Sequence, residues 1–370
     1  MKKSIVLALA AVRDGAKVNT LSKVSVTELS LPCSDGTVLT AQRWRAPDTS
    51  NEAQDRTVQR VLCLHGWMDN CKSFYSLAPA LVAEIPELDI VCLDFPGHGK
   101  SSHKSLDSPP MVASENAYYV SEAVQALEWC PEPITVSSKK RHITRNSKSG
   151  ASMYTSPFTI IGHSLGAAVS TLYAAAFPEH IERLVLLDGG GFLPRKAEDT
   201  AFHVRNHIVR RQRGNASKKE PRVYPNLEAA IQTRLKTAAK LPGDEILSYE
   251  TASELVGRAV KPVDGSEHEV QFRHDSRYLW PSIQYMTFEQ NVGIFQDVEC
   301  ENVCLLLAQN GYPMVPDQVE TTKELLGAEC HTLPGSHYFH ADPQTADAVS
   351  MKIAEFIRRT DYSSSHRSSL

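Results

Sequence analysis

The chain of 370 residues can bury a large hydrophobic core, either as one domain or as a domain that carries an insertion. Its composition, 42% hydrophobic and 22% charged, is that of an ordinary globular protein. The formal net charge of −4 gives no global attraction to nucleic acid or anionic membrane, and no apolar run has the length of a membrane span, so we expect neither a nucleic-acid partner nor a transmembrane segment.

Residues 1–20 are expected to form an N-terminal extension. A basic start and the apolar stretch 5–12 resemble the beginning of a short signal peptide, but Arg13 and Asp14 follow at once. Secretion through residues 1–12 therefore remains an alternative to a cytoplasmic location, which we expect. A second alternative is the peroxisome, because the C-terminal Ser-Ser-Leu is similar to the Ser-Lys-Leu address.

Cysteine usage favours a reducing compartment. The sequence contains eight cysteines and no C-x-x-C pair of the kind that suggests a zinc or redox site. Cys63, Cys92 and Cys304 fall inside predicted buried strands, where a thiol behaves as a small apolar side chain. We expect eight free thiols and no metal.

Short apolar runs alternate with helical patterns along most of the chain. Strands are predicted at 24–32, 37–44, 61–64, 90–93, 158–161, 184–187, 303–307 and 330–333. Helices are predicted at 74–83, 117–127, 167–177, 317–326 and 344–358. Near-continuous apolar strands between helices predict an α/β fold, with a mostly parallel eight-stranded sheet and helices on both faces.

Two segments interrupt this alternation and divide the chain. Residues 131–157 are polar and basic, and we expect a disordered surface insertion there. Residues 192–299 have helical character, many basic residues and no convincing apolar strand, which predicts a helical cap inserted after the sixth strand. The core then comprises 21–191 and 300–361, and residues 362–370 form a flexible tail.

The pentapeptide 162–166, Gly-His-Ser-Leu-Gly, fits the pattern G-x-S-x-G. A buried strand precedes it and a helix of small apolar residues follows it, which is the setting of a nucleophile elbow. Gly162 and Gly166 lack a Cβ and so relieve the crowding in such a turn. Ser164 is the predicted nucleophile, exposed at a helix N-terminus.

A serine hydroxyl needs a base to take its proton, and the base needs a partner that orients it. His337 follows the last predicted strand, at the sheet edge where Ser164 is expected, and is the predicted base; His340 is its rival. The acid is less defined. The acid is usually found in the loop after the strand predicted at 303–307, but that loop contains no carboxylate. Three alternatives remain: Asp188 at the end of the neighbouring strand, Asp317, or no acid at all. Asp188 is preferred.

The developing negative charge requires two backbone N–H groups. One is expected from Leu165, directly after the nucleophile, and the other from Trp67, in the turn after strand 61–64. The side chains of Trp67, Met68 and Leu165 are expected to line the substrate pocket. The turn at 94–101 contains two glycines and a proline, and we interpret it as scaffolding in which His98 has no catalytic role.

Together, the string at 64–70 (Leu-His-Gly-Trp-Met-Asp-Asn), the string at 94–99 (Asp-Phe-Pro-Gly-His-Gly) and the elbow resemble the α/β-hydrolase superfamily, and within it the serine hydrolase-like proteins. The resemblance covers about residues 24–190 and 300–360. It implies a nucleophile at Ser164, a base at His337 and oxyanion N–H groups at Trp67 and Leu165, with no cofactor. The sequence departs from the pattern at Tyr312, where an aspartate normally stands.

Three functions compete at this point. The preferred one is hydrolysis of a carboxylic ester or thioester of a small-molecule acyl substrate, through an acyl-enzyme on Ser164. The second is a catalytically weak or inactive protein of the same fold that binds a small molecule. The third, binding of nucleic acid or an acidic partner through the basic cap, is weaker because the surrounding chain is net acidic. The oligomeric state stays open.

Overall fold

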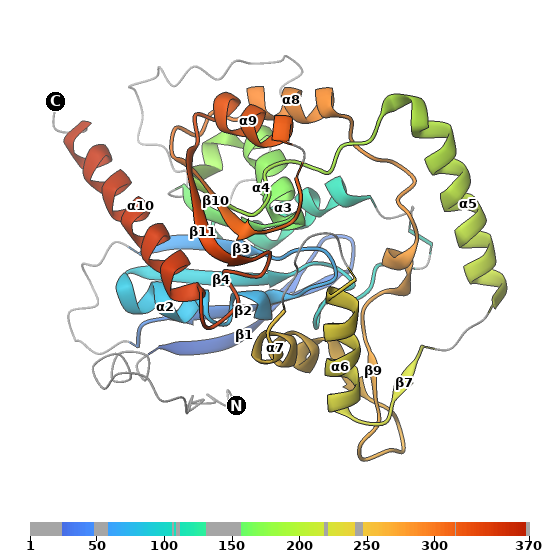
Figure 1. Cartoon of the computed structure of the whole chain (residues 1–370). Helices are drawn as coiled ribbons and strands as arrows, with labels where there is room; N and C mark the ends of the chain where they lie inside the picture. Colours follow the sequence, from blue (N-terminus) through green and yellow to red (C-terminus); the bar gives the residue numbers. More distant parts are fainter. Residues whose placement is uncertain are drawn as a thin grey trace.

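An eight-stranded sheet lies at the centre of the computed structural model (Figure 1). Its strands follow the order β1-β2-β4-β3-β5-β6-β10-β11. Their bounds are β1 Ser25–Pro32, β2 Val38–Arg45, β3 Gln59–Leu64, β4 Leu88–Asp94, β5 Phe158–His163, β6 Ile181–Leu187, β10 Val303–Asn310 and β11 Glu329–Ser336. β2 pairs antiparallel with β1 and β4, and all other neighbours are parallel, which confirms the expected mostly parallel sheet.

The structure describes residues 24–47, 58–105, 107–108, 112–130, 157–217, 221–240, 247–314 and 316–367. The expectations for the N-terminal extension 1–20, and for all but the last residue of the 131–157 insertion, lie outside these residues. All eight cysteines lie within them and are free thiols.

Helices cover both faces of the sheet, as the sequence predicts. α2 (Leu77–Glu84) and α10 (Ala346–Arg367) pack together on one face, and α3 (Asn116–Ala126) and α4 (Leu165–Ala176) lie on the other (Figure 1). Each face has its own cluster of buried apolar side chains. Residues 61–64 and 90–93 are completely buried between these clusters. Burying each aliphatic side chain of this kind stabilises the fold by about 1.5–3 kcal/mol. These two central strands therefore hold the carboxyl end of the sheet in place.

Two helix boundaries differ from the prediction. A short 3-10 helix, Cys71–Phe74, precedes α2, which therefore begins at Leu77 rather than at residue 74. α10 continues to Arg367, whereas we expected a helix that ends at 358 and a flexible tail over 362–370. The tail prediction was wrong for 362–367 because these polar residues carry no apolar periodicity, which was the signal used.

The segment between β6 and α8, residues 192–287, is called the cap segment here. It contains α5 (Thr200–Ser217), α6 (Leu227–Ala238) and α7 (Tyr249–Ala259), and a small sheet of β7 (Val223–Tyr224), β9 (Val270–Phe272) and β8 (Val260–Pro262). The expected all-helical character missed this sheet because strands of two or three residues show no periodicity. α8 (Phe288–Gln296), although inside the expected range 192–299, packs against α4 and α9 (Pro316–Leu325) of the core.

Buried arginines attach α6 and α7 to the core. Arg234 of α6 donates to Asp69 Oδ1 (2.9 Å), and Arg258 of α7 donates to Asp94 Oδ2 (2.8 Å). Burial disfavours the charged form of Asp94, but the charge of Arg258 and N–H groups of the backbone outweigh this effect and lower the pKa of the carboxyl. α5 lacks such an attachment among the described ion pairs and extends along the side of the molecule (Figure 1).

Candidate active site

Ser164 stands between β5 and α4 in a strained backbone conformation. Its φ of 53° and ψ of −115° lie outside the regions that L-residues prefer, which costs of order 1–3 kcal/mol. The Ser164 N–H donates to the Leu187 carbonyl of the neighbouring strand at 3.0 Å. The surrounding chain thus holds the turn, and the hydroxyl is presented at the carboxyl edge of the sheet.

Both glycines of the pentapeptide are required by close backbone approach. A Cβ at Gly166 would lie far inside van der Waals contact with the Leu64 carbonyl oxygen, and one at Gly162 would overlap Ser170 Oγ and the Gly166 carbonyl. Gly166 therefore allows the start of α4 to lie directly against the end of β3. This contact brings the turn after β3 next to Ser164.

Gly166→Ala is expected to lower the free energy of unfolding by at least about 3 kcal/mol, because the added Cβ meets rigid backbone rather than a movable side chain. Chemical denaturation followed by circular dichroism measures this effect. Gly293→Ala in α8 is the matched control, since its Cβ would meet nothing within 4 Å and alanine favours a helix. Equal stability of the two variants would contradict the close approach.

His337 and Asp188 meet at the same edge of the sheet. His337 Nδ1 lies 2.5 Å from Asp188 Oδ2, and both side chains are buried. Asp188 follows β6 with a positive φ of 46°, and His337 follows β11. A carboxylate at Nδ1 fixes the tautomer of the imidazole and leaves Nε2 to accept a proton.

The end of β10 and the loop after it carry no carboxylate of their own because they surround the carboxylate of Asp188. The N–H groups of Ala308 and Tyr312 donate to Asp188 Oδ1 (3.0 Å) and Oδ2 (2.9 Å). A Cβ at Gly311 would overlap the Asp188 carboxylate, so the loop wraps closely around it. The alternative acid, Asp317, is exposed in the first turn of α9.

The turn at 65–67 lies beside the nucleophile. A Cβ at Gly66 would come within 3.2 Å of Ser164 Cβ. His65 orients this turn: its Nε2 accepts the Phe95 N–H (3.0 Å), so Nδ1 carries the proton and donates to the Gly66 carbonyl (2.8 Å). The N–H of Leu165, the first residue of α4, has no acceptor within its own helix. The geometry is therefore compatible with the predicted oxyanion pair, Trp67 and Leu165.

His340, the rival base, is buried away from the cavity that contains Ser164. Its ring lies 4.1 Å from that of His163, between centroids. Neither of its nitrogens has a hydrogen-bond partner among the described residues. His98 is also buried, with Nδ1 on the Pro96 carbonyl (3.0 Å) and its ring 4.4 Å from Tyr278, which agrees with a scaffolding role.

Buried histidines predict that the protein loses stability in acid. Burial lowers the pKa of His65 and His163, and lowers that of His98 and His340 to about 3. An unfolded histidine has a pKa of about 6.5, so below that pH the unfolded chain binds more protons than the folded one. The free energy of unfolding should fall as the pH decreases from about 6.5 towards 3, by about 1.4 kcal/mol per pH unit for each of His98 and His340, and His65 and His163 add to the fall in the same direction.

Denaturant unfolding at several pH values between 7 and 4.5 measures this slope. His340→Phe should make it shallower by about 1.4 kcal/mol per pH unit, because phenylalanine fits the apolar surroundings and does not titrate. An identical slope in both proteins would mean that His340 is charged in the folded state.

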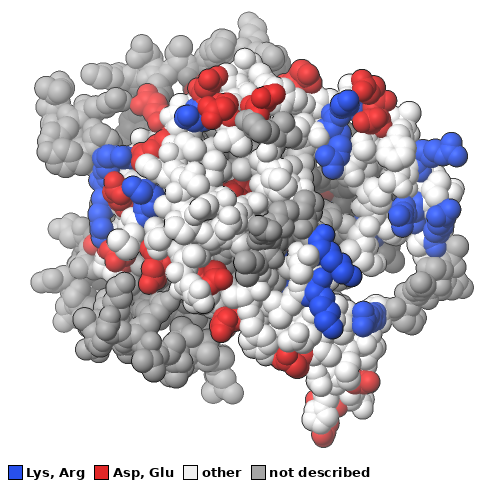
Figure 2. All heavy atoms as spheres, in the orientation of Figure 1, with Lys and Arg blue, Asp and Glu red and all other residues white. Residues whose placement is uncertain are grey.

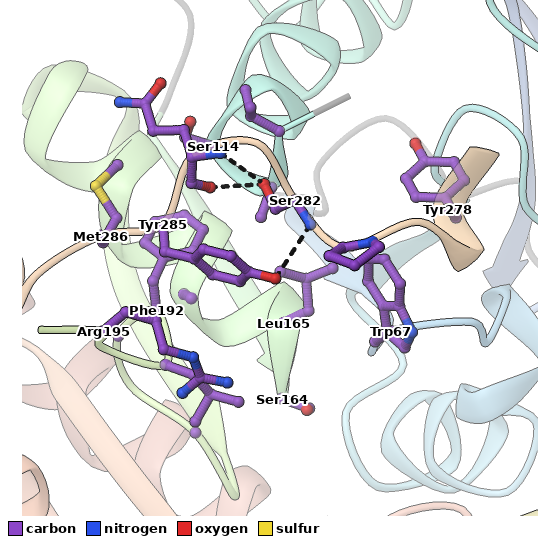
Figure 3. A pocket seen from close by; sticks show the side chains of 18 of the residues that line it. Trp67, Ser114, Ser164, Leu165, Phe192, Arg195, Tyr278, Ser282, Tyr285 and Met286 are labelled. Atoms are coloured by element: carbon purple, nitrogen blue, oxygen red, sulfur yellow. Dashed lines mark hydrogen bonds between the residues drawn. The ribbon is translucent and has the colours of Figure 1, made fainter. Parts of the chain in front are cut away.

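Ser164, Asp188 and His337 line one cavity of about 740 Å³ beneath the cap segment (Figure 3). Trp67 and Leu165 line it too, as expected. Met68, whose backbone has a positive φ of 59°, is not among the residues of the cavity wall. The structure therefore does not support the expectation that Met68 lines the pocket.

Most of the cavity wall could not be identified from the sequence. Aromatic side chains dominate it: Trp67, Phe192, Phe202, Tyr278, Trp280, Tyr285 and Tyr312. The concentration of aromatic residues over 278–285 was the available signal, but it does not by itself distinguish a pocket from a core. Within the described residues, no group of acidic, histidine or cysteine side chains is arranged to hold a metal ion. No described helix is both long and apolar enough to cross a membrane.

A family model described as the alpha/beta hydrolase fold matches residues 59–342. The chain belongs to the α/β-hydrolase family. It is 32% identical over 310 residues to a serine hydrolase-like protein of Danio rerio, with 80% of this chain and 81% of the relative covered.

Solved structures share this architecture. A hypothetical protein from Pseudomonas aeruginosa superposes with a TM-score of 0.69 and 30% identity, covering 90% of this chain and 99% of that one. The thioesterase domain from the curacin biosynthetic pathway superposes with a TM-score of 0.62 at 19% identity, covering 88% and 99%. At that identity the second likeness concerns the fold alone.

Proposed function

We propose that this α/β-hydrolase cleaves a carboxylic ester or thioester through an acyl-enzyme on Ser164. The observation that carries the proposal is the hydrogen bond of 2.5 Å between His337 Nδ1 and Asp188 Oδ2, in the wall of the cavity that also contains Ser164. A nucleophile on a strained turn, a buried histidine and a buried carboxylate from three different strand ends form the constellation that acyl transfer requires.

In the proposed reaction, Ser164 Oγ attacks the carbonyl carbon while His337 Nε2 takes the hydroxyl proton. Asp188 stabilises the resulting imidazolium through Nδ1. The N–H groups of Trp67 and Leu165 stabilise the negative charge on the carbonyl oxygen. His337 then protonates the leaving alcohol or thiol, and the acyl-enzyme forms. Water, deprotonated by His337, releases the acid and regenerates the Ser164 hydroxyl.

The cavity supports an acyl substrate of substantial size. A volume of about 740 Å³ exceeds what a small acid requires, and its aromatic lining suits an apolar acyl chain or ring. The cap segment forms one side of this cavity and limits the access of water to the acyl-enzyme.

A fluorophosphonate probe tests the proposal directly. The wild-type protein should form a covalent adduct at Ser164 by mass spectrometry, and p-nitrophenyl esters of increasing acyl length should then rank the substrates. A folded protein that neither labels nor hydrolyses any ester of the series would contradict the proposal. It would favour the alternative of a non-catalytic binding protein, which the missing carboxylate in the loop after β10 suggests.

A further inference from the structure

We propose that Arg195 forms a subsite for an anionic group of the substrate, a carboxylate or a phosphate, inside the cavity that contains Ser164. This inference rests on the proposed function, because it specifies which esters or thioesters that site accepts. Arg195 lies in the cap segment and lines the cavity together with Ser164 and His337.

The backbone fixes where Arg195 enters the cavity. The Arg195 N–H donates to the Met286 carbonyl at 2.8 Å, which joins the two ends of the cap segment. The guanidinium carbon lies 5.4 Å from the centroid of the Tyr285 ring, a cation–π distance. In Figure 3, Arg195 and Ser164 lie on the same side of the Tyr285 ring. Arg195 is exposed, so the backbone bond fixes where its side chain starts, and the ring contact restricts the positions that the guanidinium takes before a ligand binds.

The other charged groups of the cavity wall are already paired. Asp188 pairs with His337. Arg277 pairs with Asp275 (2.6 Å), a residue that lies outside the cavity wall. Arg195 has no carboxylate partner among the described ion pairs, and its one described side-chain hydrogen bond is to the Pro194 carbonyl (3.2 Å). A guanidinium has five N–H donors, so most of them remain for a ligand. His337 and two backbone N–H groups occupy the Asp188 carboxylate, and Asp275 neutralises Arg277, so Arg195 is the cation of the described cavity wall that is left without a carboxylate partner.

The adjoining helix adds to this positive potential. α5 contributes Phe202, His203 and Asn206 to the cavity wall. Its sequence, TAFHVRNHIVRRQRGNAS, contains four arginines and no acidic residue; Glu198 and Asp199 directly precede it, and Glu198 pairs with Lys196. Figure 2 shows Lys and Arg side chains over the side of the molecule where α5 lies. An approaching anion is therefore attracted to the cavity mouth, while the net charge of the chain is −4.

The anionic group that Arg195 binds is attached either to the acyl group of the substrate or to its leaving group. Two matched pairs of substrates distinguish these two positions. p-Nitrophenyl hydrogen adipate and p-nitrophenyl hexanoate differ in a carboxylate on the acyl side. The S-butyryl thioesters of 3-mercaptopropionate and 3-mercaptopropionamide differ in a carboxylate on the thiol side. The ratio of kcat/KM, anionic over neutral, is measured for each pair at low ionic strength.

In one of the two pairs this ratio should be about 10 or more in the wild-type protein, which is the expected size of a partly solvated charge-assisted hydrogen bond. Arg195→Gln should lower that ratio to about 1, and Arg195→Lys should keep part of it. Arg358→Gln, an exposed arginine of α10 that lies outside the cavity wall and outside α5, is the matched control and should leave the ratio unchanged. Ratios near 1 in both pairs, or ratios equal in wild type and Arg195→Gln, would overturn the subsite.

A binding measurement separates failure of the subsite from failure of the hydrolase proposal. Adipate should raise the melting temperature of Ser164→Ala more than sodium chloride at equal ionic strength does, and Ser164→Ala/Arg195→Gln should lose this difference. If no ester is hydrolysed but adipate stabilises only the protein with Arg195, the subsite stands and the hydrolase function falls. If esters are hydrolysed but neither the ratio nor the melting temperature depends on Arg195, the subsite falls alone.

Discussion

Replacing Ser164 with alanine is expected to lower kcat/KM for an activated ester by about 10⁴-fold or more, because the hydroxyl that forms the proposed acyl-enzyme is removed. Release of p-nitrophenol from a good ester of the graded series measures the loss. The alanine variant should also gain no mass when it is treated with the fluorophosphonate probe.

The same substitution should not impair folding. Ser164 holds a backbone conformation that is unfavourable for any L-residue, and alanine tolerates it no worse than serine does. Ser30→Ala, at an exposed position of β1, is the matched control and should keep full activity. Activity of Ser164→Ala within tenfold of wild type would place the nucleophile elsewhere.

Asp188→Asn is expected to lower kcat by about 10⁴-fold, because a neutral amide no longer stabilises the imidazolium and allows the wrong tautomer of His337. Steady-state kinetics on the same ester measures the effect. A moderate loss of stability, about 1–3 kcal/mol, should accompany it. Both carboxylate oxygens accept N–H groups, from Ala308 and Tyr312, and an amide has only one oxygen to offer.

Asp317→Asn is the matched control, since Asp317 is the carboxylate that the sequence left as an alternative and it is exposed on α9. It should change neither kcat nor stability. A large loss of activity in Asp317→Asn, with Asp188→Asn near wild type, would reverse the assignment of the acid.

The strand and helix pattern was predictable because it depends on local sequence. Residues 61–64 and 158–161 are apolar runs bounded by polar or turn residues, and the structure has strands there. The small β7-β9-β8 sheet and the extension of α10 to Arg367 were not predictable, because neither has a local periodic signal. Met68 illustrates a third kind of failure: it directly follows Trp67 in the sequence, yet it is not part of the cavity wall that Trp67 lines.

By itself, the sequence determined the fold family and the identity of the nucleophilic turn. The pattern G-x-S-x-G between an apolar strand and a helix of small residues is a local requirement: Gly162 and Gly166 are needed wherever backbone crosses so closely, so the motif is visible in the sequence. The order of the strands along the chain likewise follows from short-range patterns.

Only the tertiary structure decided which carboxylate orients His337, and which side chains form the cavity. Asp188 and His337 are 149 residues apart in sequence, and their contact depends on the parallel pairing of β6, β10 and β11. The N–H groups that hold Asp188 come from Ala308 in β10 and from Tyr312 in the loop after it, a stretch whose own sequence contains no acid. Arg195 carries a charge that a sequence shows as ordinary surface. Its proposed role arises because Arg277, the other arginine of the cavity wall, is paired with Asp275, and such pairing depends on packed geometry rather than on sequence order.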